Sequence, residues 1–84
     1  MPTISSFYGI VIMMFLVEKE HNPPHIHAFY NEYEASFALE NAKLIAGKFP
    51  KNGTKLVKEF VKHYKEELLE MWMTGQNKKL PPLN

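Results

Sequence analysis

Three of the four histidines in this chain fall within one short segment, as His21, His25 and His27. Histidine is the commonest metal ligand among side chains, and its charge changes near neutral pH. The prolines Pro23 and Pro24 stand between these histidines and favour a rigid, extended turn. This segment is the most concentrated group of reactive side chains in the sequence, and its spacing raises the question of a metal or acid–base site.

A metal-dependent reaction is one interpretation of this spacing. On a strand, His25 and His27 would project to the same side, about 6 to 7 Å apart. His21 could turn back as a third ligand, and Glu20 or Glu34 could act as a ligand or general base. Such donor sets are typical of catalytic zinc and non-haem iron sites, where a bound water becomes nucleophilic. One hypothesis is therefore a divalent metal-dependent hydrolase of RNA or a phosphoester, with His21, His25 and His27 as ligands.

Two other interpretations of the histidines stay open. They could be half-exposed strand residues, with Pro23-Pro24 only fixing the path into the strand. They could also recognise a partner or act in catalysis without a metal. Neither the substrate, the metal nor the partner can be named from the sequence.

Composition limits the other classes of function. The 84 residues include no cysteine, which excludes disulfides and thiolate sites. All ten basic residues are lysine, so the planar arginine fork that recognises phosphate and guanine is absent, and we expect no strong duplex nucleic-acid binding. The start of the chain lacks a basic targeting region, and its apolar run is shorter than the roughly 20 residues that cross a bilayer. We therefore expect a cytoplasmic protein without membrane contact, and a small core that favours a protein partner or a homodimer.

The hydrophobic pattern predicts an α+β fold in a single domain, residues 1–84. It indicates an antiparallel meander of three to four strands, packed on one long C-terminal helix and followed by an extended tail. The expected strands are 9–17, 26–30, 33–39 and 43–47, the helix is 54–73 and the tail is 76–84. Asn52 or Thr54 is the expected helix cap, and Gly75 the expected end. The first strand is apolar on both sides, so one helix covers only half of it, and a tail, a loop or a second subunit would cover the rest.

The second and third expected strands form a hairpin if Asn31-Glu32 is a two-residue loop. Tyr30 then lies opposite Tyr33, and His27 opposite Ser36. The face expected to pack on the helix carries Ile26, Ala28, Tyr30, Tyr33, Ala35, Phe37 and Leu39. The more polar face carries His25, His27, Phe29, Glu34, Ser36 and Ala38. This register predicts that the histidines lie away from the main core.

The chain resembles an uncharacterised family of small bacterial proteins, defined as a domain of unknown function. The resemblance covers essentially the whole chain. It rests on Met1-Pro2-Thr3-Ile4-Ser5, Gly9-Ile10, His21-Asn22-Pro23-Pro24-His25-Ile26-His27-Ala28 with Tyr30, and Glu66-Glu67-Leu68-Leu69-Glu70 with Trp72. The family has no established activity, but its members are similar to proteins encoded beside another small protein, which implies a toxin–antitoxin-like module.

This chain departs from the family pattern in its basic residues. Relatives often have arginine near the start, in the first strand and at the entry to the helix, where this chain has Ser6, Met13 and lysines. Ile26 stands where phenylalanine is usual. If those arginines bind a phosphate-bearing substrate, this chain has lost that role. The leading hypothesis is therefore an intracellular binding or regulatory protein that meets its partner through the face with His25 and His27.

Overall fold

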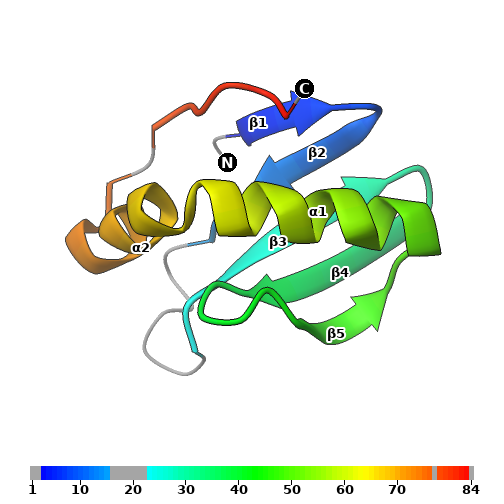
Figure 1. Cartoon of the computed structure of the whole chain (residues 1–84), viewed down its shortest axis with the longest axis horizontal. Helices are drawn as coiled ribbons and strands as arrows, with labels where there is room; N and C mark the ends of the chain where they lie inside the picture. Colours follow the sequence, from blue (N-terminus) through cyan, green and yellow to red (C-terminus); the bar gives the residue numbers. More distant parts are fainter. Residues whose placement is uncertain (1–2, 16–22, 77, 84) are drawn as a thin grey trace.

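The computed structural model describes residues 3–15, 23–76 and 78–83. They form a five-stranded antiparallel sheet in the order β1-β2-β3-β4-β5, with two consecutive helices packed across one face (Figure 1). The elements are β1 (Thr3–Phe7), β2 (Ile10–Met13), β3 (His25–Tyr30), β4 (Tyr33–Ala38), β5 (Leu44–Lys48), α1 (Lys51–His63) and α2 (Lys65–Thr74). The α+β class and the antiparallel meander agree with the prediction. Its three to four strands and its single long helix were wrong.

The additional strand is β1, which pairs with β2 through a tight hairpin. Tyr8 and Gly9 form the turn, with φ angles of 52° and 79°, and Phe7 lies opposite Ile10. The segment 9–17 was predicted as one strand, yet only Ile10–Met13 belong to β2. Residues 16 and 17 lie outside the described part of the chain. Propensity did not identify β1, because its two serines dilute the apolar pattern of a short segment.

The β3–β4 hairpin has the predicted register. Tyr30 pairs with Tyr33 and His27 with Ser36. Asn31 has a φ of 53°, a conformation that asparagine tolerates better than most residues. The correct register places Ile26, Ala28 and Phe37 on the face that packs against the helices, where all three are fully buried.

The helical segment begins earlier than predicted and is interrupted. Neither Asn52 nor Thr54 is the cap; Pro50 is, and the Thr54 amide already donates to the Pro50 carbonyl at 2.8 Å. Tyr64 separates α1 from α2 with φ −110° and ψ 24°. Apolar periodicity continues through this position, which is why the sequence predicted one helix. Gly75 ends α2 as predicted, in the left-handed conformation with a φ of 73°.

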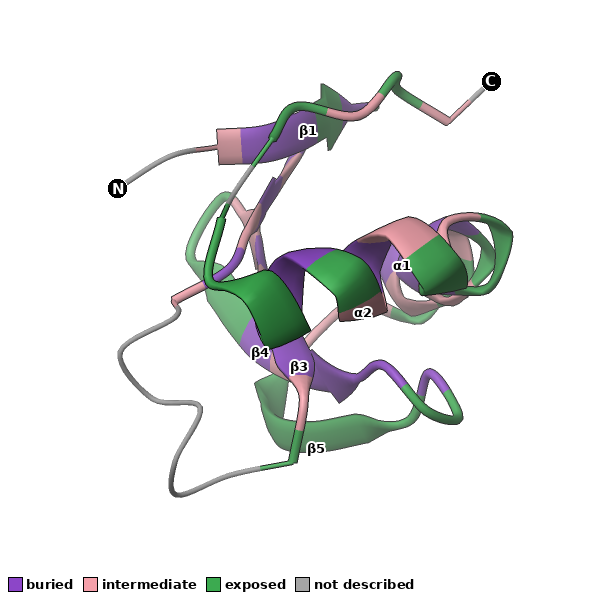
Figure 2. Ribbon diagram, turned by 90° about the vertical axis from the view of Figure 1, so that its left-hand side faces the viewer, coloured by how far each residue is buried: buried purple, intermediate pink, exposed green. Residues whose placement is uncertain are grey.

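The core lies between the helices and one face of the sheet, which we call the helix face. Its largest fully buried side chains are Ile4, Ile10, Ile12, Met14, Ile26, Phe37, Leu39, Val57, Phe60, Val61, Leu68 and Met71. The tail returns to β1, where the Leu80 amide donates to the Ile4 carbonyl at 2.8 Å and Ser5 Oγ donates to the Pro81 carbonyl at 3.3 Å. Leu80 and Leu83 pack against the core. The tail therefore completes the helix face at β1 (Figures 1 and 2).

None of the described helices is long and apolar enough to cross a membrane.

Candidate functional site

The face of the sheet opposite the helices, which we call the outer face, carries the candidate site. Strand alternation places every second residue of β2, β3 and β4 on it. Across the strands, Met13 pairs with His27 and His27 with Ser36. In the neighbouring row, Val11 pairs with Phe29 and Phe29 with Glu34. The outer face thus combines half-buried apolar side chains with a histidine, a hydroxyl and a carboxylate.

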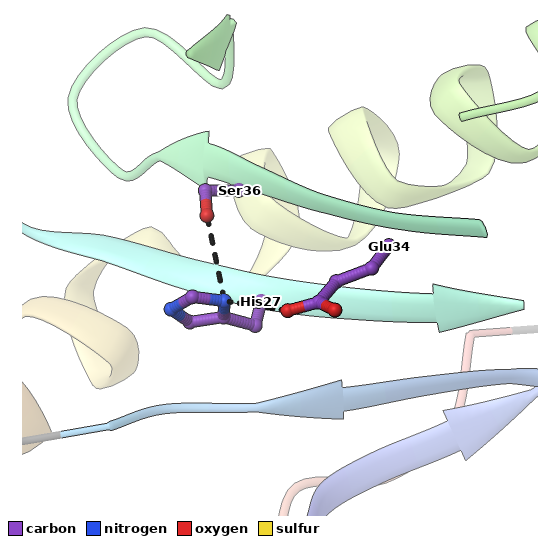
Figure 3. A network of polar contacts seen from close by, with 3 residues as sticks. All are labelled: His27, Glu34 and Ser36. Carbon is purple, nitrogen blue, oxygen red and sulfur yellow. Dashed lines mark hydrogen bonds and ion pairs between the residues drawn. The ribbon is translucent and has the colours of Figure 1, made fainter. Parts of the chain in front are cut away.

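His27 lies in the middle of this face and contacts both polar neighbours on β4 (Figure 3). A hydrogen bond joins its Nδ1 to Ser36 Oγ at 3.4 Å, and Glu34 Oε2 is 3.9 Å from the same nitrogen. The Phe15 ring meets the imidazole edge to face, with 4.4 Å between ring centroids. The His27 side chain is only 12% exposed, while that of Glu34 is 61% exposed. Because Glu34 is largely in water, its ion pair with His27 adds little stability.

The Ser36, His27 and Glu34 side chains do not form a catalytic relay. In a serine–histidine–acid relay, the hydroxyl contacts one ring nitrogen and the carboxylate contacts the other. Here both oxygens approach Nδ1. The group therefore orients the imidazole, with Nδ1 toward β4, rather than activating Ser36 as a nucleophile.

His25 lies on the same side of β3 but in a different environment. Its side chain is buried, with an exposed fraction of 3%, and its Nδ1 is 2.8 Å from the Pro23 carbonyl oxygen. The Trp72 ring of α2 lies at 5.2 Å between centroids. The prediction that His25 faces away from the main core was thus incomplete, because α2 brings a core tryptophan to the end of β3.

The His25 and His27 imidazoles are close neighbours, with an angle of 61° between their ring planes. Their ring centroids are 5.1 Å apart. A carbonyl oxygen only accepts hydrogen bonds, so the Pro23 contact places the proton of neutral His25 on Nδ1 and its lone pair on Nε2. His27 Nδ1 also lies near oxygen atoms, those of Ser36 and Glu34, and the Ser36 hydroxyl can either donate a hydrogen bond to this nitrogen or accept one from it. Metal-binding histidines are commonly held in this way, by a carbonyl or carboxylate on the second ring nitrogen.

The predicted metal site also included His21 and Glu20, and both lie outside the described residues. The structure brings His25, His27 and Glu34 together on or beside the outer face. Within residues 3–15, 23–76 and 78–83, no three His, Cys, Asp or Glu residues gather as possible ligands of a metal ion. A metal at His21, His25 and His27 stays a prediction.

Two aromatic neighbours of the histidines were not assigned to the site from the sequence. Phe15 contacts His27, and Trp72 contacts His25. The alternation of apolar residues at Val11, Met13 and Phe15 indicates that Phe15 shares a face with Met13. Only the β2–β3 register, which pairs Met13 with His27, shows that this face adjoins β3. Trp72 is also part of the buried core. Its contact with His25 has no signal in the sequence, because it depends on the path of α2.

The resemblance noted from the sequence is confirmed by comparison with protein families. A family model, domain of unknown function DUF4160, matches residues 9–73. The chain belongs to the DUF4160 family. The matched region contains His25, His27, Glu34 and Ser36, whereas β1 and the paired tail segment lie outside it. No curated protein and no solved structure matches the chain. DUF4160 membership assigns no activity, so a functional proposal depends on the site itself.

Proposed function

We propose that this protein is a small binding or regulatory protein that meets a protein partner through its outer face, as one component of a toxin–antitoxin-like pair. The supporting observation is the composition of that face. Val11, Met13 and Phe29 are half-buried and adjoin the polar side chains of His27 and Ser36. Apolar and aromatic groups bordered by polar ones are characteristic of protein interfaces. The family resemblance supports a partner encoded beside this protein.

The distribution of packing supports the choice of this face. Both helices and the tail pack against the core on the helix face or at β1. On the outer face, the rings of Phe15, His27 and Phe29 contact one another. A partner that covered them would bury a rigid aromatic group, the kind of residue that dominates binding energy at interfaces.

Co-expression with the neighbouring gene product, followed by size-exclusion chromatography, tests the pairing directly. We expect the two proteins to elute together as one complex at micromolar concentration. Separate elution at that concentration would contradict the proposal.

A pair of variants tests the surface. Phe29→Glu places a charge at the centre of the outer face, and Met73→Glu makes the same type of change at an exposed position of α2. We expect Phe29→Glu to weaken the complex by about 30-fold or more, as loss of a central aromatic contact does, and Met73→Glu to leave it unchanged. Circular dichroism of both variants controls for folding. Equal affinities would exclude the outer face as the contact surface.

A second proposed function is the metal-dependent hydrolase of RNA or a phosphoester. The specific observation in its favour is the proximity of His25 and His27, whose ring centroids are 5.1 Å apart and whose Nδ1 atoms each lie near an oxygen atom. In His25, the contact with the Pro23 carbonyl makes Nε2 the electron-pair donor of the neutral ring, the kind of atom that zinc and iron bind. The hypothesis adds His21 as a third ligand and Glu20 or Glu34 as ligand or general base.

Elemental analysis of protein purified without a histidine tag tests this second function. We expect a near-stoichiometric divalent metal and a thermal shift when zinc, iron, manganese or nickel is added. The His25→Ala, His27→Ala double variant should lose both. A metal content below about a tenth of an equivalent, with no thermal shift, would contradict a metal site.

A further inference from the structure

The two edges of the sheet are treated differently by the rest of the chain. At the β1 edge, the tail contributes a backbone hydrogen bond from Leu80 to Ile4 and a side-chain bond from Ser5 to Pro81. At the other edge, β5 pairs with β4 alone, and no described segment lies along its outer side (Figure 2). We call the outer backbone of Leu44–Lys48 the β5 edge. Among the described residues, this edge has no neighbouring segment of the chain, whereas the β1 edge is partly occupied by the tail.

The β5 edge is exposed along its whole length and partly apolar. All five residues of the strand are exposed. Leu44 and Ile45 are 37% and 45% exposed, and they are adjacent, whereas the other large exposed apolar side chains are dispersed over the described chain. An exposed strand edge offers amide and carbonyl groups to an incoming strand, and neighbouring apolar side chains add contact area.

The lysines at the two ends of β5 indicate which kind of strand could pair with the β5 edge. Lys43 precedes β5 and Lys48 ends it, and both are exposed; Lys48 also lies opposite Glu34 across β4 and β5. If β5 paired antiparallel with β5 of a second copy, Lys43 of each copy would lie opposite or beside Lys48 of the other at both ends. Like charges at such positions destabilise strand pairing, and edge lysines are a known means of preventing self-association. An acidic strand meets the same lysines favourably.

We propose that the β5 edge binds an extended segment of a partner protein as a sixth strand, and that this segment is apolar in its middle and acidic at both ends. Backbone hydrogen bonds to β5 supply the affinity. Leu44 and Ile45 contact the apolar middle, while Lys43 and Lys48 select the acidic ends. The β5 edge adjoins the outer face, because Lys48 pairs with Glu34, but it offers backbone groups rather than the His27 and Phe29 side chains, so this inference goes beyond the proposed function.

Three synthetic peptides test the edge on the full chain. The probe is labelled Glu-Val-Thr-Val-Thr-Val-Glu, and one comparison peptide has both glutamates replaced by lysine. A second comparison peptide keeps the probe sequence but is N-methylated on two adjacent central residues, which removes donors from both of its edges. We expect fluorescence anisotropy at low ionic strength to show at least about tenfold tighter binding of the probe than of either comparison peptide.

Matched variants and hydrogen exchange locate the contact. Ile45→Ser should weaken probe binding at least about tenfold, and Met73→Ser, the same change at an exposed helix position, should not. Backbone amides of β5 should gain protection from exchange when the probe is bound. Both variants leave the buried core untouched, so each is expected to fold.

Several results would overturn the proposal. No binding up to about millimolar probe excludes the sixth strand, and equal binding of the acidic and lysine peptides excludes charge selection. Protection on β2 and β3 instead of β5 would move the contact to the outer face. A dimer that Ile45→Ser dissociates would identify a second copy as the occupant. None of these results bears on co-elution with the neighbouring protein or on Phe29→Glu, so the two proposals fail separately.

Discussion

The two faces of one sheet have different chemical compositions, although the same strands supply both. On β3, Ile26 and Ala28 face the helices and are fully buried, whereas His27 and Phe29 face outward and are half-buried. The helix face is mainly apolar and holds the fold together. The outer face mixes aromatic, apolar and polar groups, as a binding surface does. The difference separates the residues that stabilise the protein from those available for function.

His25 is an exception to this difference between the two faces. By alternation it belongs to the outer face with His27, yet its side chain is buried beside Trp72. The two histidines are only two residues apart on β3. Burial therefore depends on which element reaches the end of the strand, and α2 reaches His25, the first residue of β3.

The largest expected effect lies on the helix face. Phe37→Ala removes a fully buried ring that packs edge to face against Phe49. We expect the free energy of unfolding to fall by about 3–5 kcal/mol, because the lost burial and the cavity add together. Urea denaturation followed by the fluorescence of Trp72, the only tryptophan, measures it. A loss below about 1 kcal/mol would mean that the helix face is not the main source of stability.

The second largest loss of stability is expected for a substitution of His25. His25→Ala leaves the Pro23 carbonyl without its imidazole donor and removes the ring beside Trp72. We expect a loss of roughly 2–3 kcal/mol in the same denaturation experiment. His25→Phe, which keeps a ring but no donor, should recover part of that loss. If His25→Ala cost no more than His27→Ala, the two histidines would share one environment after all.

An aromatic residue of the outer face is expected to matter less for folding. Phe29→Ala removes a half-buried ring whose contacts include Phe15 and His27. We expect a loss of about 1 kcal/mol, since a partly exposed side chain loses less burial and leaves no closed cavity. Differential scanning calorimetry provides the comparison with Phe37→Ala. Equal losses for the two phenylalanines would remove the distinction between the faces.

The smallest expected effect is at the polar group around His27. Ser36→Ala removes a hydrogen bond of 3.4 Å, close to the limit of such bonds. We expect a change in the free energy of unfolding within about 0.5 kcal/mol. The Cβ of alanine occupies the same place, so packing is retained. A loss well above 1 kcal/mol would show that this contact stabilises the fold and does more than orient the imidazole.

The sequence predicted the local parts of the fold well. The Asn31-Glu32 turn gave the β3–β4 register, because a two-residue loop between alternating strands leaves few other pairings. Gly75 was recognised as the helix end, since only glycine takes a positive φ without strain. Apolar residues recur at helical spacing within the predicted helix 54–73, and two of them, Phe60 and Leu68, are fully buried.

The parts that the sequence did not predict depend on distant contacts. β1 is stabilised by pairing with β2 and by the tail, whose Leu80 is far away along the chain. The interruption at Tyr64 leaves the apolar periodicity intact and so gives no signal. At the β5 edge, Gly47 has a φ of 82° and a Cβ there would collide with the Glu34 carbonyl, a requirement visible only once β4 and β5 are paired.

The sequence by itself determined which side chains share a face, because strand alternation and turn length are local properties of the backbone. It therefore placed His25, His27, Glu34 and Ser36 on one side of the hairpin. Only the tertiary structure decided that His25 is enclosed by Trp72, that β1 rather than β5 receives the tail, and that β5 stays exposed. These features depend on how segments far apart in the chain pack together, and neither periodicity nor spacing encodes that packing.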